Sequence, residues 1–393
     1  MSILFVGGGS HINAYDIATG SQCIDSTTLY DLVDGSVSDL AFNPAGTKLA
    51  VSYRYAEMLV FDMANGWVLE NENGFGTGAL SCAFSPDGSM LAATFGSGQF
   101  KIFDTSTWSE LTGPIYDDRP GASGDLLHCA FSPDGSVLVI AGNTSGAPLH
   151  IYSTSTWARI EVDVIPDGWP VTRLAFSPDG SRLYVVHNGN SRIAVYNTST
   201  WTKISGTPTL TGNPAACAVS NNGLYFAVSM VTTSPFLKVY NTTTWAEVSI
   251  EEPYNYIEDL MFSPDDAVLY VTRNSGSNRL RRYDTAVSPW ALDTIQLQQP
   301  ELNASALAYS TDTPAQLGTS AANPVKDEFD QPVQAKVRMY DRTSGKLIAE
   351  TTTAADGSYT FVPLAKKSEV DVVFLDPDGG NLNNDLIVRA IPA

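Results

Sequence analysis

The fold is decided by a phrase that recurs along the chain and is clearest as CAFSPDG, at residues 82–88 and again at 129–135. Related copies are LAFNPAG at 40–46, LAFSPDG at 174–180, CAVSNNG at 217–223 and LMFSPDD at 260–266. A last copy, LAYS at 307–310, has no such turn after it. The spacing, about 42–47 residues, is that of a four-stranded blade in a β-propeller.

Each phrase joins two strands through a turn whose residues have defined tasks. Proline fixes φ at the first central position, aspartate suits the second, and glycine adopts the left-handed conformation before the next strand. A second phrase follows each first one, as in IFDTSTW at 102–108 and VYNTSTW at 195–201. Its alternating strand and Thr/Ser-rich turn predict a third strand in each blade.

The order of the strands predicts how the ring closes. The chain starts with a second strand (3–6), a third strand (12–16) and an outer strand near Cys23, and its last repeat strand (305–309) is a first strand without successors. We expect this last strand to complete the N-terminal three, because closure removes exposed sheet edges. The sequence therefore predicts an all-β fold with a seven-bladed β-propeller at residues 1–310.

The composition changes after Tyr309. Residues 311–324 are rich in small residues and proline, and they read as a linker. Apolar residues then alternate along two stretches, namely Val337, Met339, Leu347 and Ala349, and Val370, Val372 and Phe374. This pattern predicts a small antiparallel β-sandwich at residues 325–393, of about 70 residues, near the lower size limit for independent folding.

Charge and cysteine usage exclude several functions. The net charge of −20 offers no electrostatic footprint for nucleic acid or for an anionic membrane. The N-terminus has no basic segment followed by an apolar core, so we expect no signal peptide, and no apolar run is long enough to span a bilayer. The four cysteines show neither a disulfide framework nor a CxxC spacing.

The repeat resembles the YVTN/WD40-like propellers, although the Gly-His and Trp-Asp pairs of WD40 blades are missing. The tail resembles the carboxypeptidase-regulatory-like, or transthyretin-like, sandwich. More closely, it resembles a C-terminal domain of tailed-bacteriophage virion proteins, in which Met339 here replaces the usual leucine. The matching residues are Val337, Tyr340, Asp341, Arg342, Thr343, Gly345, Asp356, Gly357, Tyr359 and Phe361.

The tryptophans are candidates for a binding surface. Six tryptophans fall at the same turn of successive repeats, where packing of one blade on the next explains them better than sugar stacking: Trp67, Trp108, Trp157, Trp201, Trp245 and Trp290. Trp169 lies outside this register, on a loop before an inner strand. It is therefore the candidate for an exposed surface contact.

No residue set predicts catalysis, and we expect no cofactor. The chain has four histidines, His11, His128, His150 and His187, and none of the GxSxG, HExxH or phosphate-loop motifs. His128 lies on an inner strand, where it lines the central channel or is a satisfied strand histidine. Oxygen ligands at Asp376, Asp378, Asn381 and Asp385 form a weak calcium candidate, but their spacing departs from the EF-hand and a hairpin turn explains them more simply.

The tail resemblance and the expected absence of a signal peptide favour a non-enzymatic structural or adhesion protein of a tailed-phage virion, assembled in the host cytoplasm. Its expected partners are other virion proteins and the host cell surface, and its oligomeric state stays open. One alternative is a lactonase, since YVTN-like propellers include phosphogluconolactonases and LYVTRN (269–274) resembles their repeat. Another is a cytoplasmic bacterial scaffold, because one fold hosts many functions.

Overall fold

The computed structural model describes twenty stretches of the chain: 3–8, 11–16, 22–24, 35–63, 68–70, 75–111, 115–116, 125–142, 149–160, 169–187, 192–230, 234–250, 257–273, 280–286, 290–292, 304–310, 336–341, 347–352, 370–375 and 386–390. In these stretches the regular structure is all β-strand, apart from one 3-10 turn, η2 (Gly96–Gly98). The predicted all-β class is thereby confirmed. No described helix is long and apolar enough to cross a membrane.

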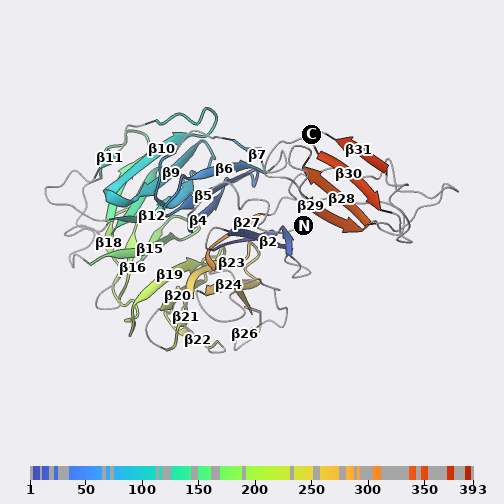
Figure 1. Cartoon of the computed structure of the whole chain (residues 1–393). Helices are drawn as coiled ribbons and strands as arrows, with labels where there is room; N and C mark the ends of the chain where they lie inside the picture. Colours follow the sequence, from blue (N-terminus) through green and yellow to red (C-terminus); the bar gives the residue numbers. More distant parts are fainter. Residues whose placement is uncertain are drawn as a thin grey trace.

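The first three repeats form one sheet each (Figure 1). Sheet 1 contains β4 (Val37–Phe42), β5 (Lys48–Tyr53), β6 (Leu59–Asp62) and β7 (Val68–Leu69). Sheet 2 contains β8 (Ala79–Phe84), β9 (Met90–Phe95), β10 (Gln99–Asp104) and β11 (Ile115–Tyr116). Sheet 3 contains β12 (Leu126–Phe131), β13 (Val137–Gly142) and β14 (Leu149–Ser153).

The next three repeats follow the same plan. Sheet 4 contains β15 (Val171–Phe176), β16 (Arg182–His187), β17 (Arg192–Asn197) and β18 (Thr202–Lys203). Sheet 5 contains β19 (Pro214–Val219), β20 (Tyr225–Met230), β21 (Leu237–Asn241) and β22 (Glu247–Val248). Sheet 6 contains β23 (Ile257–Phe262), β24 (Val268–Arg273), β25 (Leu280–Asp284) and β26 (Ala291–Leu292).

Sheet 7 joins strands from two distant parts of the chain. It contains β1 (Ile3–Gly8), β2 (His11–Asp16), β3 (Gln22–Ile24) and β27 (Ala304–Ser310), in the order β27-β1-β2-β3. The β1–β27 pairing is antiparallel, and Leu4 lies opposite Tyr309. The predicted pairing of the late strand with the N-terminal three is therefore present.

The first strands of successive sheets contact one another around the whole group. The contacts run β4–β8, β8–β12, β12–β15, β15–β19, β19–β23 and β23–β27, and β27 also contacts β4. A buried apolar cluster lies between each neighbouring pair of sheets, including a cluster on either side of sheet 7. Burial of apolar side chains between the sheets is thus the main stabilising contribution.

The SPDG turns are held by side chains and stack from sheet to sheet. In sheet 2, the Ser85 hydroxyl donates to the Asp87 carboxylate at 2.6 Å and accepts from the amide of Met90 at 2.9 Å. Gly88 has a φ of 73°, and a Cβ there would lie 3.4 Å from Cδ of Pro44 in the preceding sheet. Glycine therefore meets both the backbone conformation and the close approach.

The turn of sheet 6 departs from this pattern together with its neighbour. Asp266 replaces the glycine and keeps a positive φ of 58°. In sheet 5, Asn221 replaces the proline and so has an amide hydrogen, which it donates to Asp266 at 2.7 Å. The Asn222 amide donates to the other oxygen of Asp266, also at 2.7 Å. The two substitutions compensate each other across the sheet boundary.

The repeated tryptophans belong to the scaffold wherever they are described. Trp108, Trp157, Trp201 and Trp245 share a left-handed backbone, with φ between 54° and 58°. Each of these four, and Trp290, packs into the apolar cluster between its own sheet and the preceding one. The scaffold interpretation is confirmed for these five, and Trp67 lies outside the described residues.

A separate sheet contains the tail strands β28 (Lys336–Asp341), β29 (Leu347–Thr352), β30 (Val370–Leu375) and β31 (Leu386–Ala390), in the order β29-β28-β30-β31 (Figure 1). The predicted alternation is in register, since Met339 lies opposite both Ala349 and Val372. The described residues contain this single tail sheet, so the second layer of the predicted sandwich stays a prediction.

Candidate functional site

One register position varies from sheet to sheet while its surroundings repeat. Each first strand has a register shift near its start, and one residue holds the equivalent place in each sheet. It directly follows the shift in six sheets, whereas in sheet 5 the shift runs from Pro214 to Cys217 and the equivalent residue, Ala216, lies within it. We call these residues the inner ring; in sheet order they are Asp39, Ser81, His128, Arg173, Ala216, Asp259 and Ala306. A β-bulge redirects a side chain, and bulges are common next to functional sites.

Side chains of the inner ring meet across the group of sheets. Arg173 is on sheet 4 and Asp259 on sheet 6, yet Nη2 of Arg173 lies 3.9 Å from Oδ1 of Asp259. Sheet 5 separates these two sheets, so the side chains approach each other in the middle of the group. Both keep 15% of their side-chain surface exposed, which allows limited access to solvent.

Asp39 links the first two sheets. Its Oδ1 accepts from the amide of Leu40 at 3.0 Å, and its Oδ2 accepts from the hydroxyl of Ser81 at 2.6 Å and the amide of Cys82 at 3.2 Å. Ser81 continues the chain, because its hydroxyl oxygen accepts from the amide of Cys129 in sheet 3 at 3.4 Å.

Asp259 links the sixth sheet to the closing strand. Its Oδ1 accepts from the amide of Leu260 at 3.0 Å, and its Oδ2 accepts from the amide of Leu307 in β27 at 3.0 Å. The same carboxylate also faces Arg173. Asp259 thus ties the late strand of sheet 7 to sheet 6 by a charge-assisted hydrogen bond.

The inner ring holds charges in surroundings that shift their titration. Burial raises the pKa of Asp259 to about 6 and also raises that of Asp39, although the positive charge of Arg173 opposes both shifts. For Arg173, burial alone favours the neutral form, but the carboxylates of Asp259 and Asp39 outweigh it and the pKa rises. Burial, and then Arg173, holds the pKa of His128 well below its usual value, so its imidazole is neutral at pH 7.

The repeated cysteines directly follow residues of this ring; Cys82 and Cys129 are buried, and Cys217 is partly buried. Burial raises the pKa of the Cys129 and Cys217 thiols to about 12, and that of Cys82 is also raised well above its usual value. A thiol acts as nucleophile or metal ligand in its thiolate form, which these shifts disfavour. The three thiols are free, in agreement with their interpretation as small core residues.

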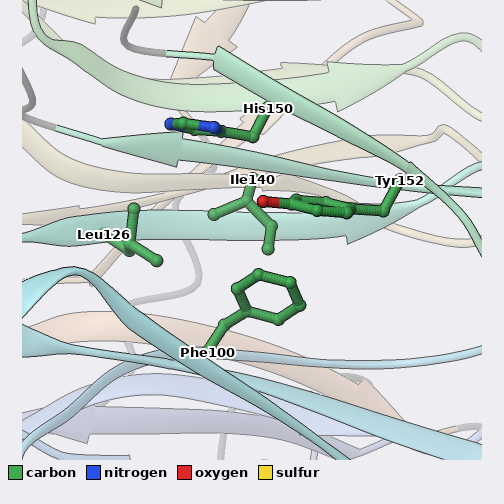
Figure 2. Close-up of a pocket in the computed structure, with 5 residues that line it drawn as sticks. All are labelled: Phe100, Leu126, Ile140, His150 and Tyr152. Atoms are coloured by element: carbon green, nitrogen blue, oxygen red, sulfur yellow. The ribbon is translucent and has the colours of Figure 1, made fainter. Parts of the chain in front are cut away.

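The other candidates predicted from the sequence lie apart from the ring. Trp169 is 41% exposed, before β15, and contributes to no apolar cluster of the described residues. His187 and His150 are buried strand residues, and His11 begins β2. His150 lines a small hollow with Phe100, Leu126, Ile140 and Tyr152 (Figure 2), which is part of the apolar packing between sheets 2 and 3.

The calcium candidate, Asp376, Asp378, Asn381 and Asp385, lies outside the described residues. Among the residues that are described, no group of three or more His, Cys, Asp or Glu side chains is placed to hold a metal ion. Sequence reasoning singled out His128 in the ring and missed Asp39, Ser81, Arg173 and Asp259. The sequence does contain a signal for these positions, because the residue before each Leu/Cys-Ala-Phe phrase changes from repeat to repeat while the phrase itself recurs.

Comparison with known proteins agrees with this architecture. Residues 73–104 match the family model of the WD domain, G-beta repeat. No curated protein matched the chain.

Solved structures with similar folds include a candidate 6-phosphogluconolactonase from Bacteroides fragilis, with a TM-score of 0.59 at 12% identity, covering 78% of this chain and 97% of that one. The β-propeller domain of Cps50 (Swd1) from Myceliophteria thermophila gives a TM-score of 0.58 at 16% identity, covering 72% of this chain and 93% of that one. A chain of a mitotic checkpoint complex gives 0.56 at 17% identity, covering 69% and 79%.

The repeat match and these neighbours define the class: the chain contains a WD40-like β-propeller. At such identities the likeness concerns the fold alone. The neighbours include proteins of different function, and function must be argued from this chain's own residues.

Proposed function

We propose that this chain is a non-enzymatic structural or adhesion protein of a tailed-bacteriophage particle. Its seven sheets are the blades of a closed propeller, which serves as a platform for other virion proteins or for the host surface. Closure is supported by the pairing of β27 with β1 and by the contacts of β27 with both β4 and β23.

The observation that supports the role as a binding platform is a difference between the two faces of the ring. Strands alternate in direction, so the SPDG turns and the Thr/Ser-rich turns, both short and repeated, lie on one face. The other face holds the described parts of the remaining connections, and the sequences of these connections differ in composition and length from sheet to sheet. Tyr55, 75% exposed between β5 and β6, and Trp169 belong to that variable face. Binding residues are typically placed on such loops.

The virion assignment is supported by the tail. The sequence from Val337 to Phe361 resembles the C-terminal domain of tailed-phage virion proteins, and the register of β28 with β29 and β30 agrees with the predicted alternation. In this proposal the tail sheet is one layer of a sandwich that docks the propeller or extends it from the particle.

Mass spectrometry of purified virions tests the virion assignment. We expect peptides of this chain in particles that remain after density-gradient purification and nuclease treatment. Their consistent absence from intact particles would overturn it and favour a cytoplasmic scaffold, which would instead be recovered from the lysate without particles.

A lactonase is the second candidate, favoured by Arg173 and His128 in the inner ring and by the fold shared with the candidate 6-phosphogluconolactonase. An enzyme of this kind should hydrolyse a sugar lactone above the spontaneous rate. Arg173→Met should abolish that rate, whereas Trp169→Ala should leave it unchanged. The same low background rate for all three proteins would exclude this candidate.

A further inference from the structure

Five backbone amides at one register position are each met by a side-chain oxygen. The amide that directly follows the inner ring residue donates to Asp39, Ser81 or Asp259, and the five donors are Leu40, Cys82, Cys129, Leu260 and Leu307. The first strand of a sheet is an edge strand, so every second amide points away from its own sheet. These five amides therefore point toward the middle of the ring.

Leu174 and Cys217 occupy the same position in sheets 4 and 5, but their surroundings differ. The inner ring residues next to them are His128, Arg173 and Ala216, and none provides an oxygen. Within the described part of the chain, no side-chain oxygen is hydrogen-bonded to either amide. This sector therefore presents hydrogen-bond donors where the other sheets place acceptors.

Arg173 and His128 add further hydrogen-bonding groups without partners among the described residues to the same sector. Among the described residues, Arg173 makes the 3.9 Å ion pair with Asp259 and no hydrogen bond, although a guanidinium carries five donors. The buried Nδ1 of His128 has no hydrogen-bond partner there. Buried or half-buried polar groups are normally satisfied by protein, water or ligand.

We propose that this sector binds a small carboxylate anion. Its oxygens take the places that side-chain oxygens hold beside the other five amides, and they accept from Leu174, Cys217 and the guanidinium of Arg173. A planar carboxylate fits the fork of an arginine side chain. One negative charge suits the site better than two, since Asp39 and Asp259 face the same space.

Binding depends on the ionisation of the groups around the site. Asp39 and Asp259 lie opposite Arg173, Glu258 adds a weaker negative charge that also raises the pKa of Arg173, and His128 beside it is neutral. Burial raises the pKa of Asp259 to about 6, so this group gains a proton as the pH falls from 7 to 5. Protonation removes a competing negative charge and releases Arg173. Affinity for the carboxylate should therefore increase as the pH falls in this window. The inference does not depend on the virion assignment.

The test is calorimetric titration of the full chain with acetate, compared with inorganic phosphate, at pH 7 and pH 5.5. We expect saturable acetate binding that is several-fold tighter at pH 5.5, and weaker phosphate binding. Arg173→Met should weaken acetate binding at least tenfold, whereas Lys238→Met, which removes a cation paired with Glu247 on sheet 5, should not change it. No acetate binding by the wild type, phosphate binding as tight as acetate, or equal binding by Arg173→Met would overturn the proposal.

A second variant keeps the test valid if Arg173→Met does not fold. Asp39 and Asp259 each accept a hydrogen bond from the amide of the next residue. Ala216→Asp should likewise place a carboxylate beside the amide of Cys217 and near the positive charge of Arg173. It should abolish acetate binding in a folded protein. Unchanged acetate affinity in folded Ala216→Asp would contradict the proposed position of the anion.

Discussion

The two halves of the inner ring differ although the same repeat builds both. In sheets 1, 2 and 6, the ring residues are Asp39, Ser81 and Asp259, whose oxygens connect each sheet to the next one. In sheets 3 and 4, they are His128 and Arg173, which make no such connection among the described residues. The repeat thus fixes the backbone, and a single variable position decides whether a sector is closed by the chain itself or left able to bind a ligand.

Among the substitutions that test this difference, Asp259→Ala should cause the largest loss in the free energy of unfolding. The change leaves the amides of Leu260 and Leu307 without their acceptor and Arg173 without its counter-charge. Removing one partner of such a buried pair costs about 3–5 kcal/mol. Urea denaturation measures the free energy of unfolding. Asp259→Asn keeps one acceptor oxygen and should cost less. A loss below about 0.5 kcal/mol for Asp259→Ala would equal that of an ordinary surface substitution and would contradict the role of Asp259 as a link between sheets.

The same carboxylate should make stability depend on pH. Its pKa is raised to about 6 in the folded chain, so the folded state binds the proton more tightly than the unfolded state. Stability from this group is therefore greatest at low pH and is lost as the pH rises through about 4–6, by about 2–3 kcal/mol. The measurement is the difference in unfolding free energy between wild type and Asp259→Asn from pH 4 to 7.

Asp87 provides the opposite case as a control. Hydrogen bonds from Ser85 and Ser89 lower the pKa of this turn carboxylate. Its contribution is present at neutral pH and is lost as the pH falls below its ordinary value. Asp87→Asn should therefore remove more stability at pH 7 than at pH 3. The same pH trend for Asp87→Asn and Asp259→Asn would contradict these assignments.

Asp266→Gly should have a smaller effect, because it combines a loss with a gain. It removes the hydrogen bonds from Asn221 and Asn222 but relieves a left-handed backbone that costs about 1 kcal/mol for a residue with a Cβ. We expect a net loss of about 1 kcal/mol in urea denaturation. Adding Asn221→Pro should recover part of it, because the two turns then have the proline and the glycine that the other sheets have at these positions.

Trp169→Ala should have the smallest effect on folding. The side chain is exposed and belongs to no apolar cluster of the described residues, so the unfolding free energy should change by less than about 0.5 kcal/mol. Trp245→Ala, in the cluster between sheets 4 and 5, should cost about 3 kcal/mol. Similar costs for the two tryptophans would contradict the distinction between scaffold and surface.

The strands and turns could be predicted from the sequence because their physical causes are local. Proline, aspartate and glycine at fixed offsets determine the turn after Phe84, and the same pattern recurs in the other repeats. The role of Trp108 and its equivalents also follows from repetition. The late strand at 304–310 could be placed because its first-strand phrase has no successor.

The site could not be predicted in the same way because it joins distant residues. Arg173 and Asp259 are in contact only once sheets 4 and 6 face the same centre, and the register shift before each of them is not visible in the sequence. The compensation between Asn221 and Asp266 likewise requires knowing that the two turns are neighbours. The strands and turns follow from local chemistry, whereas the site depends on contacts between sheets that are distant in the sequence.

Closure by the late strand is the central claim, and a pair of truncations tests it most directly. Chains ending at residue 303 and at residue 324 differ by β27 and the following segment, including Leu307, which donates to Asp259. The longer chain should unfold in one cooperative thermal transition. The shorter one should lose that transition, because sheet 7 loses its first strand and Asp259 loses the hydrogen bond from Leu307. A shorter chain that unfolds as cooperatively, and at the same temperature, as the longer one would contradict the account.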